Sequence, residues 1–251
     1  MDNAIKVILL VSVLANILFL FLVNKLIAKK GGLSFLVAKS FLAIQKIRQG
    51  EGARYSPYYL RRKDQLELLE SLPRDTSEII FLGDSITEEA EWAELFKPLN
   101  VKNRGISGDT TIGLLNRLNK IIEPKPQKVF LMIGINDFLN ETKSVLEISQ
   151  IYRAIFIKIQ EQTLNTEVFV QSVLPVNNQF YRIKVDNKNV VTLNAQLQEL
   201  AKEFSYQYID LFSHFLDQQD QLDPQYTLDG IHLNGQAYLL WKQIIEQYVT
   251  A

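Results

Sequence analysis

Short apolar runs alternate with helical stretches along the chain from Glu78 onward. Most of these runs lack polar–apolar alternation, so the strands they form are expected to be buried on both faces. Strand–helix alternation repeated five times, with right-handed crossovers, predicts an α/β fold: a three-layer α/β/α sandwich around a five-stranded parallel sheet in flavodoxin-like order. The five expected strands are Ile79–Leu82, Leu99–Val101, Val129–Ile133, Val168–Val173 and Tyr208–Leu211.

Helical stretches fill the gaps between the strands. Thr110–Ile122 carries an apolar stripe, and Ser144 with Glu147 forms a capping box that starts the following helix. Tyr55–Leu72, ahead of the first strand, is also predicted to be helical. Its leucines at three-residue spacing are Leu66, Leu69 and Leu72. The other predicted helices are Thr87–Phe96, Val190–Phe204 and Gln236–Val249.

The N-terminal segment predicts a membrane anchor. Val7 to Val23 is apolar except for Ser12 and Asn16, and extension to Ile27 reaches the length of a transmembrane helix. A cleaved signal peptide is the alternative, but the start carries little positive charge and no small-residue cleavage site follows. We therefore expect an uncleaved single-pass anchor in residues 1–30.

Basic residues follow the anchor. Residues 1–63 hold 11 Lys or Arg and two acids, whereas residues 64–251 hold 16 basic and 26 acidic residues. Residues 31–54 are predicted to be a basic amphipathic juxtamembrane segment, which either lies on anionic lipid or packs on the domain that follows, 55–251. The positive-inside rule favours a cytoplasmic position for that domain.

Composition excludes several classes of function. The chain of 251 residues has no cysteine, which rules out disulfides, thiolate catalysis and zinc–thiolate sites. Basic and acidic residues are interspersed after residue 63, so no nucleic-acid partner is expected. The length suits one α/β domain with an ample core, while the oligomeric state is left open.

Three residues form a candidate catalytic triad. Ser85 follows the first strand at the start of a helix, and Asp229 and His232 lie in the loop before the last helix. The chain has only two histidines, so His232 is the natural candidate for a general base. His232 would then take the Ser85 proton while Asp229 holds the imidazole tautomer.

Two further residues are candidate oxyanion donors. Gly108 follows the second strand, where its backbone N–H can approach a ligand without a side chain in the way. Asn136 follows the third strand and carries an amide that can donate. In a parallel sheet both positions lie at the edge where ligands bind.

Other polar and aromatic residues near these positions have simpler interpretations. Asp84, Asp109 and Asp137 are expected to be turn or capping residues, and His214 a structural histidine. Residues that either line an acyl pocket or anchor loops are Phe138, Tyr226 and Val176–Tyr181.

Four blocks of residues 55–249 resemble those of the SGNH hydrolase superfamily, the GDSL-type esterases and lipases. The resemblance implies Ser85 as nucleophile, His232 as base and Asp229 as its partner. It also implies an oxyanion hole made by the Ser85 and Gly108 backbone N–H groups and the Asn136 side chain. No cofactor and no metal are expected. The blocks are Phe81–Thr87, Asn103–Thr111, Gly134–Asp137 and Asp229–Asn234.

The expected function is therefore a membrane-tethered serine esterase acting on carboxylic esters, with lysophospholipid or small acyl and acetyl esters as candidate substrates. An O-acyltransferase acting on a sugar would use the same triad, and a catalytically silent, membrane-tethered binding module is a further alternative. A metallophosphoesterase with Asp84, Asp137, Asp229 and His232 as ligands is disfavoured, because two histidines are few for a two-metal site.

Overall fold

Five parallel strands form the central sheet of the computed structural model, which describes residues 55–140, 143–180 and 184–251. Their order is β2-β1-β3-β4-β5, so the predicted five-stranded parallel sheet in flavodoxin-like order is confirmed. The strands are β1 (Ile79–Gly83), β2 (Val101–Gly105), β3 (Lys128–Met132), β4 (Glu167–Gln171) and β5 (Gln207–Ile209).

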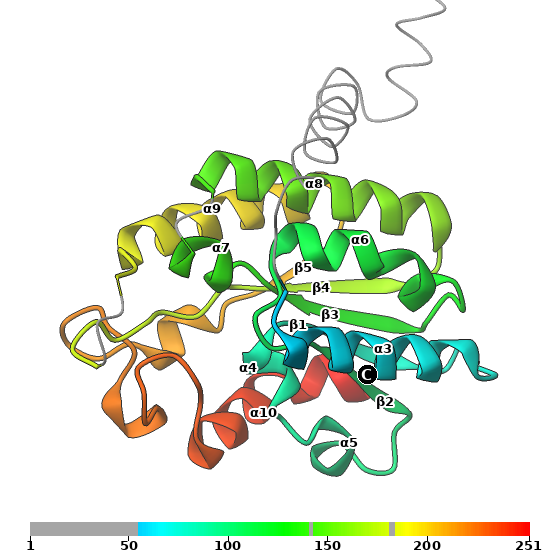
Figure 1. Cartoon of the computed structure of the whole chain (residues 1–251), viewed down its shortest axis with the longest axis horizontal. Helices are drawn as coiled ribbons and strands as arrows, with labels where there is room; N and C mark the ends of the chain where they lie inside the picture. The colour runs from blue at the N-terminus through cyan, green and yellow to red at the C-terminus, as the bar shows by residue number, and fades with distance from the viewer. Residues whose placement is uncertain (1–54, 141–142, 181–183) are drawn as a thin grey trace, which may run out of the picture. The chain divides into compact units, whose positions relative to one another are not determined.

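Helices cover both faces of this sheet. In Figure 1, α6, α8 and α9 lie on one side and α5 and α10 on the other. The helices are α3 (Pro57–Ser71), α4 (Ser85–Glu88), α5 (Trp92–Leu95), α6 (Thr111–Ile122), α7 (Ile135–Leu139), α8 (Val145–Gln162), α9 (Asn187–Glu203) and α10 (Gly235–Thr250), with 3-10 turns η1 (Phe212–Phe215) and η2 (Pro224–Tyr226).

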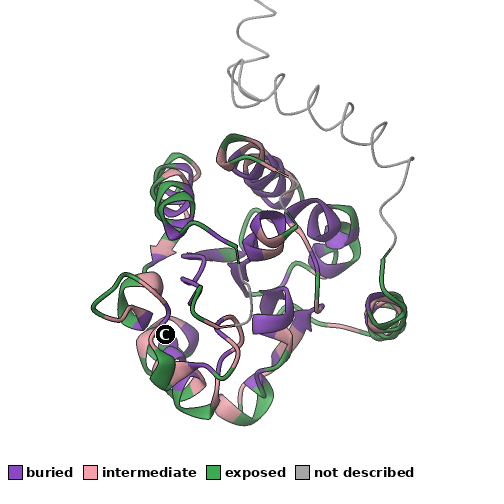
Figure 2. Ribbon diagram, turned by 60° about the vertical axis from the view of Figure 1, so that its left-hand side comes forward, coloured by how far each residue is buried: buried purple, intermediate pink, exposed green. Residues whose placement is uncertain are grey.

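Stacked aromatic rings fill the core on the α5 and α10 side. Phe81, Phe130 and Phe169 face one another in register on neighbouring strands, with ring centroids 4.9 and 4.5 Å apart. Trp92 stacks on Phe81 at 4.0 Å and meets Trp241 of α10 edge-on. Figure 2 shows most of the central sheet and the inward sides of the helices as buried, and every residue of β1 and β3 is buried. This packing gives the strand ends a rigid base.

Side-chain caps fix where several helices begin. The predicted capping box of α8 is present, because Ser144 Oγ accepts from the Glu147 backbone and the Glu147 carboxylate accepts from the Ser144 backbone. Thr110 caps α6 and Asn234 caps α10 in the same way, each through an N–H three residues on. Each cap supplies an acceptor to an N–H that would otherwise lack one.

The predicted helix Thr87–Phe96 is wrong, because the structure has two short helices, α4 and α5, in its place. Asn103 of β2 explains the break. Its Nδ2 donates to the carbonyl oxygens of Thr87, Glu88 and Ala90 at 2.9–3.1 Å, and the Trp92 indole N–H also donates to Thr87 O. Because side chains bind these carbonyls, the backbone turns after α4 instead of continuing as a helix.

The second strand lies later than predicted. We expected it at Leu99–Val101, but β2 runs from Val101 to Gly105. Its middle residues are polar, and β2 is an edge strand whose pattern of burial mixes buried and half-buried residues. The apolar run used for the prediction therefore ends at Val101, where the strand begins.

The helix predicted at Tyr55–Leu72 is present as α3, but its three leucines do not share one buried face. Leu66 is buried together with Tyr59, but Leu69 and Leu72 are exposed. Residues three apart on a helix drift around its axis by about 60° per step, so a spacing of three cannot hold one face over two steps. The seven-residue spacing of Tyr59 and Leu66 keeps both on the side that faces Ile106.

The predicted anchor in residues 1–30 and the predicted juxtamembrane segment in residues 31–54 lie outside the described residues. Within the part of the chain that the structure describes, no helix combines the length and the apolar character that crossing a membrane requires.

Candidate active site

The turn between β1 and α4 places Ser85 at the carboxyl edge of the sheet. A Cβ on Gly83 would come within 2.2 Å of Thr87 Oγ1 and 2.4 Å of Met132 O, so this turn accepts only glycine. Asp84 is the N-cap of α4, and its carboxylate accepts from Ile86 N at 3.1 Å. Ser85 is therefore the first residue of a helix held tightly against the end of β1.

The three predicted triad residues lie in direct contact. His232 Nε2 is 3.0 Å from Ser85 Oγ, and His232 Nδ1 is 2.6 Å from Asp229 Oδ2. Ser85 and His232 are 147 residues apart in the chain, and the fold brings them together at one edge of the sheet. The Ser–His–Asp chain of hydrogen bonds has the geometry that nucleophilic catalysis by a serine requires.

The carboxylate of Asp229 is fixed on both oxygens. Oδ1 accepts from the backbone N–H groups of Ile231 and His232 at 2.9 and 2.8 Å, which leaves Oδ2 for the imidazole. Partial burial raises the pKa of Asp229, but the hydrogen bonds from the His232 side chain and from the two backbone N–H groups outweigh it, so the pKa is lowered. Asp229 is therefore an ionised partner for an imidazolium.

A threonine shapes the loop that carries Asp229 and His232. Thr227 Oγ1 donates to His232 O at 2.7 Å and accepts from Gly230 N at 2.9 Å. Gly230 has a φ of +86°, which favours glycine at this point of the turn. These contacts close the loop on itself before α10 begins.

Asp109, which follows Gly108 in the chain, connects Gly108 with Asn136. Asn136 Nδ2 donates to Asp109 O at 2.9 Å, and Ile106 N donates to Gly83 O at 3.2 Å. These bonds tie the loops after β1, β2 and β3 to one another. Gly108 has a φ of +78°, and a Cβ built on it would meet no atom within 4 Å, so its surroundings are open. An open backbone beside an amide suits an anion-binding position.

Burial of Asp84 makes its charge costly. It raises the pKa of Asp84 to about 7, against the hydrogen bond from Ile86 N that lowers it. The native state then keeps a proton that the unfolded chain, with a pKa of 3.8, has released, so stability falls as pH rises from about 4 to about 7.

This difference predicts a pH-dependent effect of Asp84→Asn. Relative to the variant, the wild type should lose up to about 1.4 kcal/mol of unfolding free energy per pH unit between pH 5 and pH 7. Urea unfolding of both proteins at several pH values measures it. Asparagine keeps an acceptor for Ile86 N–H, so two curves that run parallel with pH would contradict the assignment.

The other two acidic residues predicted to be turn or cap residues are buried and have additional side-chain partners. Asp109 is fully buried and its Oδ2 accepts from Arg117 Nε at 2.8 Å. Asp137 is also buried, accepts from the backbone and side chain of Thr111, and pairs with Lys143 at 3.1 Å. Both hold α6 against the loops of the site.

The remaining candidates have mixed positions. In the stretch Val176–Tyr181, Asn177 reaches the loop of Asp229 and His232, where its backbone N–H donates to Gly230 O at 2.8 Å. His214 lies exposed in η1, and Phe138 is buried in α7. Over residues 55–140, 143–180 and 184–251, no group of three or more His, Asp and Glu side chains is arranged to hold a metal ion.

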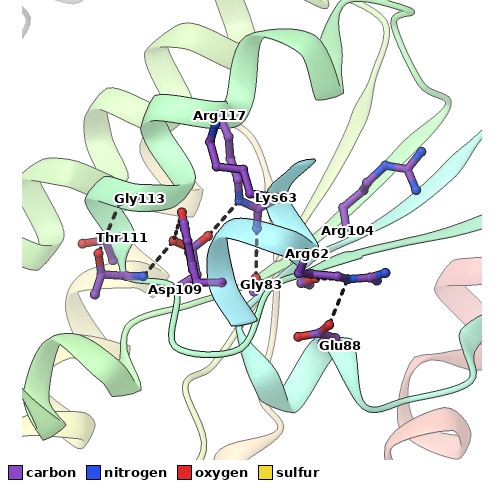
Figure 3. Close-up of polar contacts among 12 residues, drawn as sticks. Arg62, Lys63, Gly83, Glu88, Arg104, Asp109, Thr111, Gly113 and Arg117 are labelled. Carbon is purple, nitrogen blue, oxygen red and sulfur yellow. Dashed lines mark hydrogen bonds and ion pairs between the residues drawn. The ribbon is translucent and has the colours of Figure 1, made fainter. Parts of the chain in front are cut away.

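Sequence reasoning missed Glu89, whose Oε1 lies 3.9 Å from His232 Nε2. Burial raises the pKa of this half-exposed carboxyl, and His232 opposes that rise. Its position in the sequence could have indicated this contact, because the residue four positions after Ser85 lies one helical turn further on the same side of a helix. Sequence reasoning also missed the contacts of Arg62 and Glu88, shown with Asp109 and Arg117 in Figure 3.

Comparison with known proteins places this chain in a family. Residues 81–240 match the model of the GDSL-like lipase/acylhydrolase family. The chain is 29% identical to platelet-activating factor acetylhydrolase IB subunit alpha2 of Gallus gallus over 168 residues, covering 64% of this chain and 71% of that protein.

Solved structures share the fold. A protein from Streptococcus pneumonia, provisionally described as a platelet activating factor, superposes with a TM-score of 0.71 at 27% identity, covering 83% of this chain and 98% of that one. A GDSL-like lipase from Bacteroides thetaiotaomicron superposes with a TM-score of 0.66 at 23% identity, covering 74% of this chain and 96% of the other, which is a likeness of fold alone.

Proposed function

The chain belongs to the GDSL-like lipase/acylhydrolase family and is an ester-bond hydrolase, and from this premise we propose that Ser85, His232 and Asp229 perform the hydrolysis. The observation that carries the proposal is the pair of contacts from His232, at 3.0 Å to Ser85 Oγ and 2.6 Å to Asp229 Oδ2. A serine hydroxyl is a weak nucleophile unless an adjacent base takes its proton.

The proposed reaction has two halves. Ser85 Oγ attacks the ester carbonyl carbon while His232 Nε2 takes the hydroxyl proton, and the tetrahedral intermediate expels the alcohol, which receives that proton. Water then attacks the acyl-enzyme with His232 again as base, and the carboxylic acid leaves as Ser85 regains its proton. Asp229 keeps the imidazole oriented and stabilises the imidazolium in both halves.

The proposed oxyanion hole consists of the backbone N–H groups of Ser85 and Gly108 and the side-chain amide of Asn136. Asn136 Nδ2 carries two hydrogens, and the bond to Asp109 O uses one of them. That bond orients the amide and leaves the second hydrogen for the developing negative charge. Donors fixed in advance stabilise the transition state because they need no reorganisation.

Asn136→Ala should therefore lower kcat by about 10²–10³-fold. Steady-state hydrolysis of a p-nitrophenyl ester measures this loss, and thermal unfolding shows whether the fold survives without the bond to Asp109 O. Asn140→Ala, at the exposed C-terminal end of the same helix, is the matched control. Equal activity of the two variants would remove Asn136 from the oxyanion hole.

We propose small acyl esters, acetyl esters foremost, as the substrate class. The support is that the relatives at 26–29% identity are named platelet-activating factor acetylhydrolase subunits. Lysophospholipid esters stay within the proposal because of the apolar N-terminal segment. A panel of p-nitrophenyl esters of increasing chain length, lysophospholipids and acetylated sugars tests it. A steep preference for long acyl chains would contradict acetyl esters as the main substrates and would favour lysophospholipid instead.

The same experiment separates hydrolysis from acyl transfer. Analysis of products in the presence of a sugar acceptor shows whether the acyl group goes to water or to a hydroxyl. Labelling by a fluorophosphonate probe that is lost in Ser85→Ala excludes a catalytically silent binding module.

We also propose that residues 1–30 anchor the enzyme to a membrane in a single pass, with the hydrolase domain on the cytoplasmic side. The support is the apolar run from Val7 to Ile27 and the lysines that follow it. Cell fractionation with protease protection tests both statements. Recovery of the full chain in the soluble fraction would contradict the anchor, and digestion of the domain from outside would reverse the orientation.

A further inference from the structure

Both neighbours of Gly108 are held by side chains from outside their own loop. Ser107 donates to Glu88 Oε2 from its backbone N–H at 2.6 Å and from its hydroxyl at 2.7 Å. On the other side, the Tyr59 hydroxyl donates to Asp109 Oδ1 at 3.2 Å. The backbone N–H of Gly108 therefore lies between two fixed points.

Each of these fixed points leads to α3. Arg62 Nε lies 2.9 Å from Glu88 Oε1, and the Tyr58 hydroxyl donates to the same oxygen at 3.0 Å. Arg62 Nε also donates to Gly105 O at 3.4 Å, at the start of the loop. The side chains of Arg62 and Glu88 are only 24% and 9% exposed, so water screens this ion pair weakly. Figure 3 shows Arg62 reaching Glu88.

The Asp109 side of this network continues to the nucleophile turn. Arg117 donates from Nε to Asp109 Oδ2 at 2.8 Å and from Nη2 to Gly83 O at 3.1 Å. Asp109 also presents its backbone carbonyl to Asn136. A single buried aspartate thus links Tyr59 of α3 with the turn that carries Ser85 and with Asn136, whose side chain is a proposed oxyanion donor.

We propose that α3 positions the oxyanion hole, with Arg62 and Tyr59 as positioning residues that fix the loop carrying the Gly108 N–H. The inference rests on the proposed function and adds to it an element that lies ahead of the residues matched by the family model, 81–240. Neither residue touches the reacting atoms. Arg62 acts through Glu88 and Ser107, and Tyr59 acts through Asp109.

The expected effect is on turnover rather than on substrate binding. A displaced donor is weakened but not removed, so each single variant should lose less than the 10²–10³-fold expected for a missing donor. We expect kcat to fall about 10-fold or more, since a misplacement of 1 Å can cost about 10²-fold. KM should change less than 3-fold or so, because a donor that stabilises mainly the transition state contributes little to ester binding.

The experiment uses the full chain with Arg62→Met and Tyr59→Phe, singly and together. Methionine keeps much of the length of the arginine side chain without its charge, and phenylalanine keeps the buried ring and loses only the hydroxyl. Arg153→Met is the matched control, because it breaks an Arg–Glu pair of similar arginine exposure between α8 and α9. Readouts are kcat and KM on a p-nitrophenyl ester and the thermal unfolding midpoint.

Two outcomes support the proposal: a fall in kcat of each single variant at unchanged KM, and a double-variant loss that stays within about 10³-fold, because both changes weaken the same donor. Full turnover in folded Arg62→Met and Tyr59→Phe would overturn it while leaving the proposed function intact. If Arg62→Met does not fold, Tyr59→Phe alone decides. Unchanged hydrolysis by Ser85→Ala, measured beside them, would instead overturn the proposed function.

Discussion

Ser85→Ala is expected to lower kcat on the order of 10⁶-fold while the protein stays folded. In the proposed mechanism the serine hydroxyl forms the covalent bond to the acyl group, and His232 Nε2 lies 3.0 Å from that hydroxyl. The activity that remains should come from substrate binding and from the oxyanion donors, which act without the nucleophile.

Steady-state ester hydrolysis and mass spectrometry of the trapped acyl-enzyme measure this loss. Ser149→Ala is the matched control, because Ser149 is also a buried serine, on α8, whose hydroxyl bonds a helix carbonyl at 3.1 Å. Acyl-enzyme detected on Ser85→Ala would show that another residue is the nucleophile.

The positions of the candidate site residues could be predicted because the chain order fixes where each one lies relative to the sheet. Ser85, Gly108 and Asn136 each follow a different strand, and parallel strands bring their carboxyl ends to one edge. Asp229 and His232 lie in the loop before the last helix, where the spacing of three residues lets one side chain reach the other. The contacts of His232 with both partners agree with that prediction.

What surrounds these residues could not be predicted in the same way. Asn103 ends α4 by binding carbonyls 13 to 16 residues earlier, and Tyr59 reaches Asp109 across 50 residues. Neither contact has a periodic signature, because each depends on how separate elements pack. The same holds for the ion pair of Arg62 with Glu88, which in the sequence is a basic cluster followed much later by an acidic one.

The position of the edge strand β2 was predicted wrongly for a related reason. Hydrophobic runs report burial, and β2 lies at the margin of the sheet with Lys102 and Asn103 half-buried. The polar side chain of Asn103 binds the carbonyl groups at the end of α4. One polar residue thus belongs to a strand and also ends a helix, and a search for hydrophobic runs does not detect it.

Asp229→Asn is expected to lower kcat by about 10⁴-fold, because the surroundings of residue 229 would select the wrong histidine tautomer. Oδ1 accepts two backbone N–H groups, from Ile231 and His232, so an asparagine must keep its oxygen there. Its NH₂ group then takes the place of Oδ2, 2.6 Å from His232 Nδ1, and can only donate. His232 would be forced to carry its proton on Nε2, where it cannot accept the proton of Ser85.

Because the asparagine has only one orientation, the variant should change the tautomer of His232 as well as remove a negative charge. Asp223→Asn is the control, since Asp223 caps η2 in the same C-terminal region through the N–H of Gln225 and its replacement removes one carboxylate without a contact to His232. Kinetics of both variants, with a ¹⁵N spectrum of the His232 ring, measure turnover and tautomer together. If Asp229→Asn kept more than about a tenth of wild-type turnover, or if its His232 still carried the proton on Nδ1, Asp229 would not be the residue that orients the base.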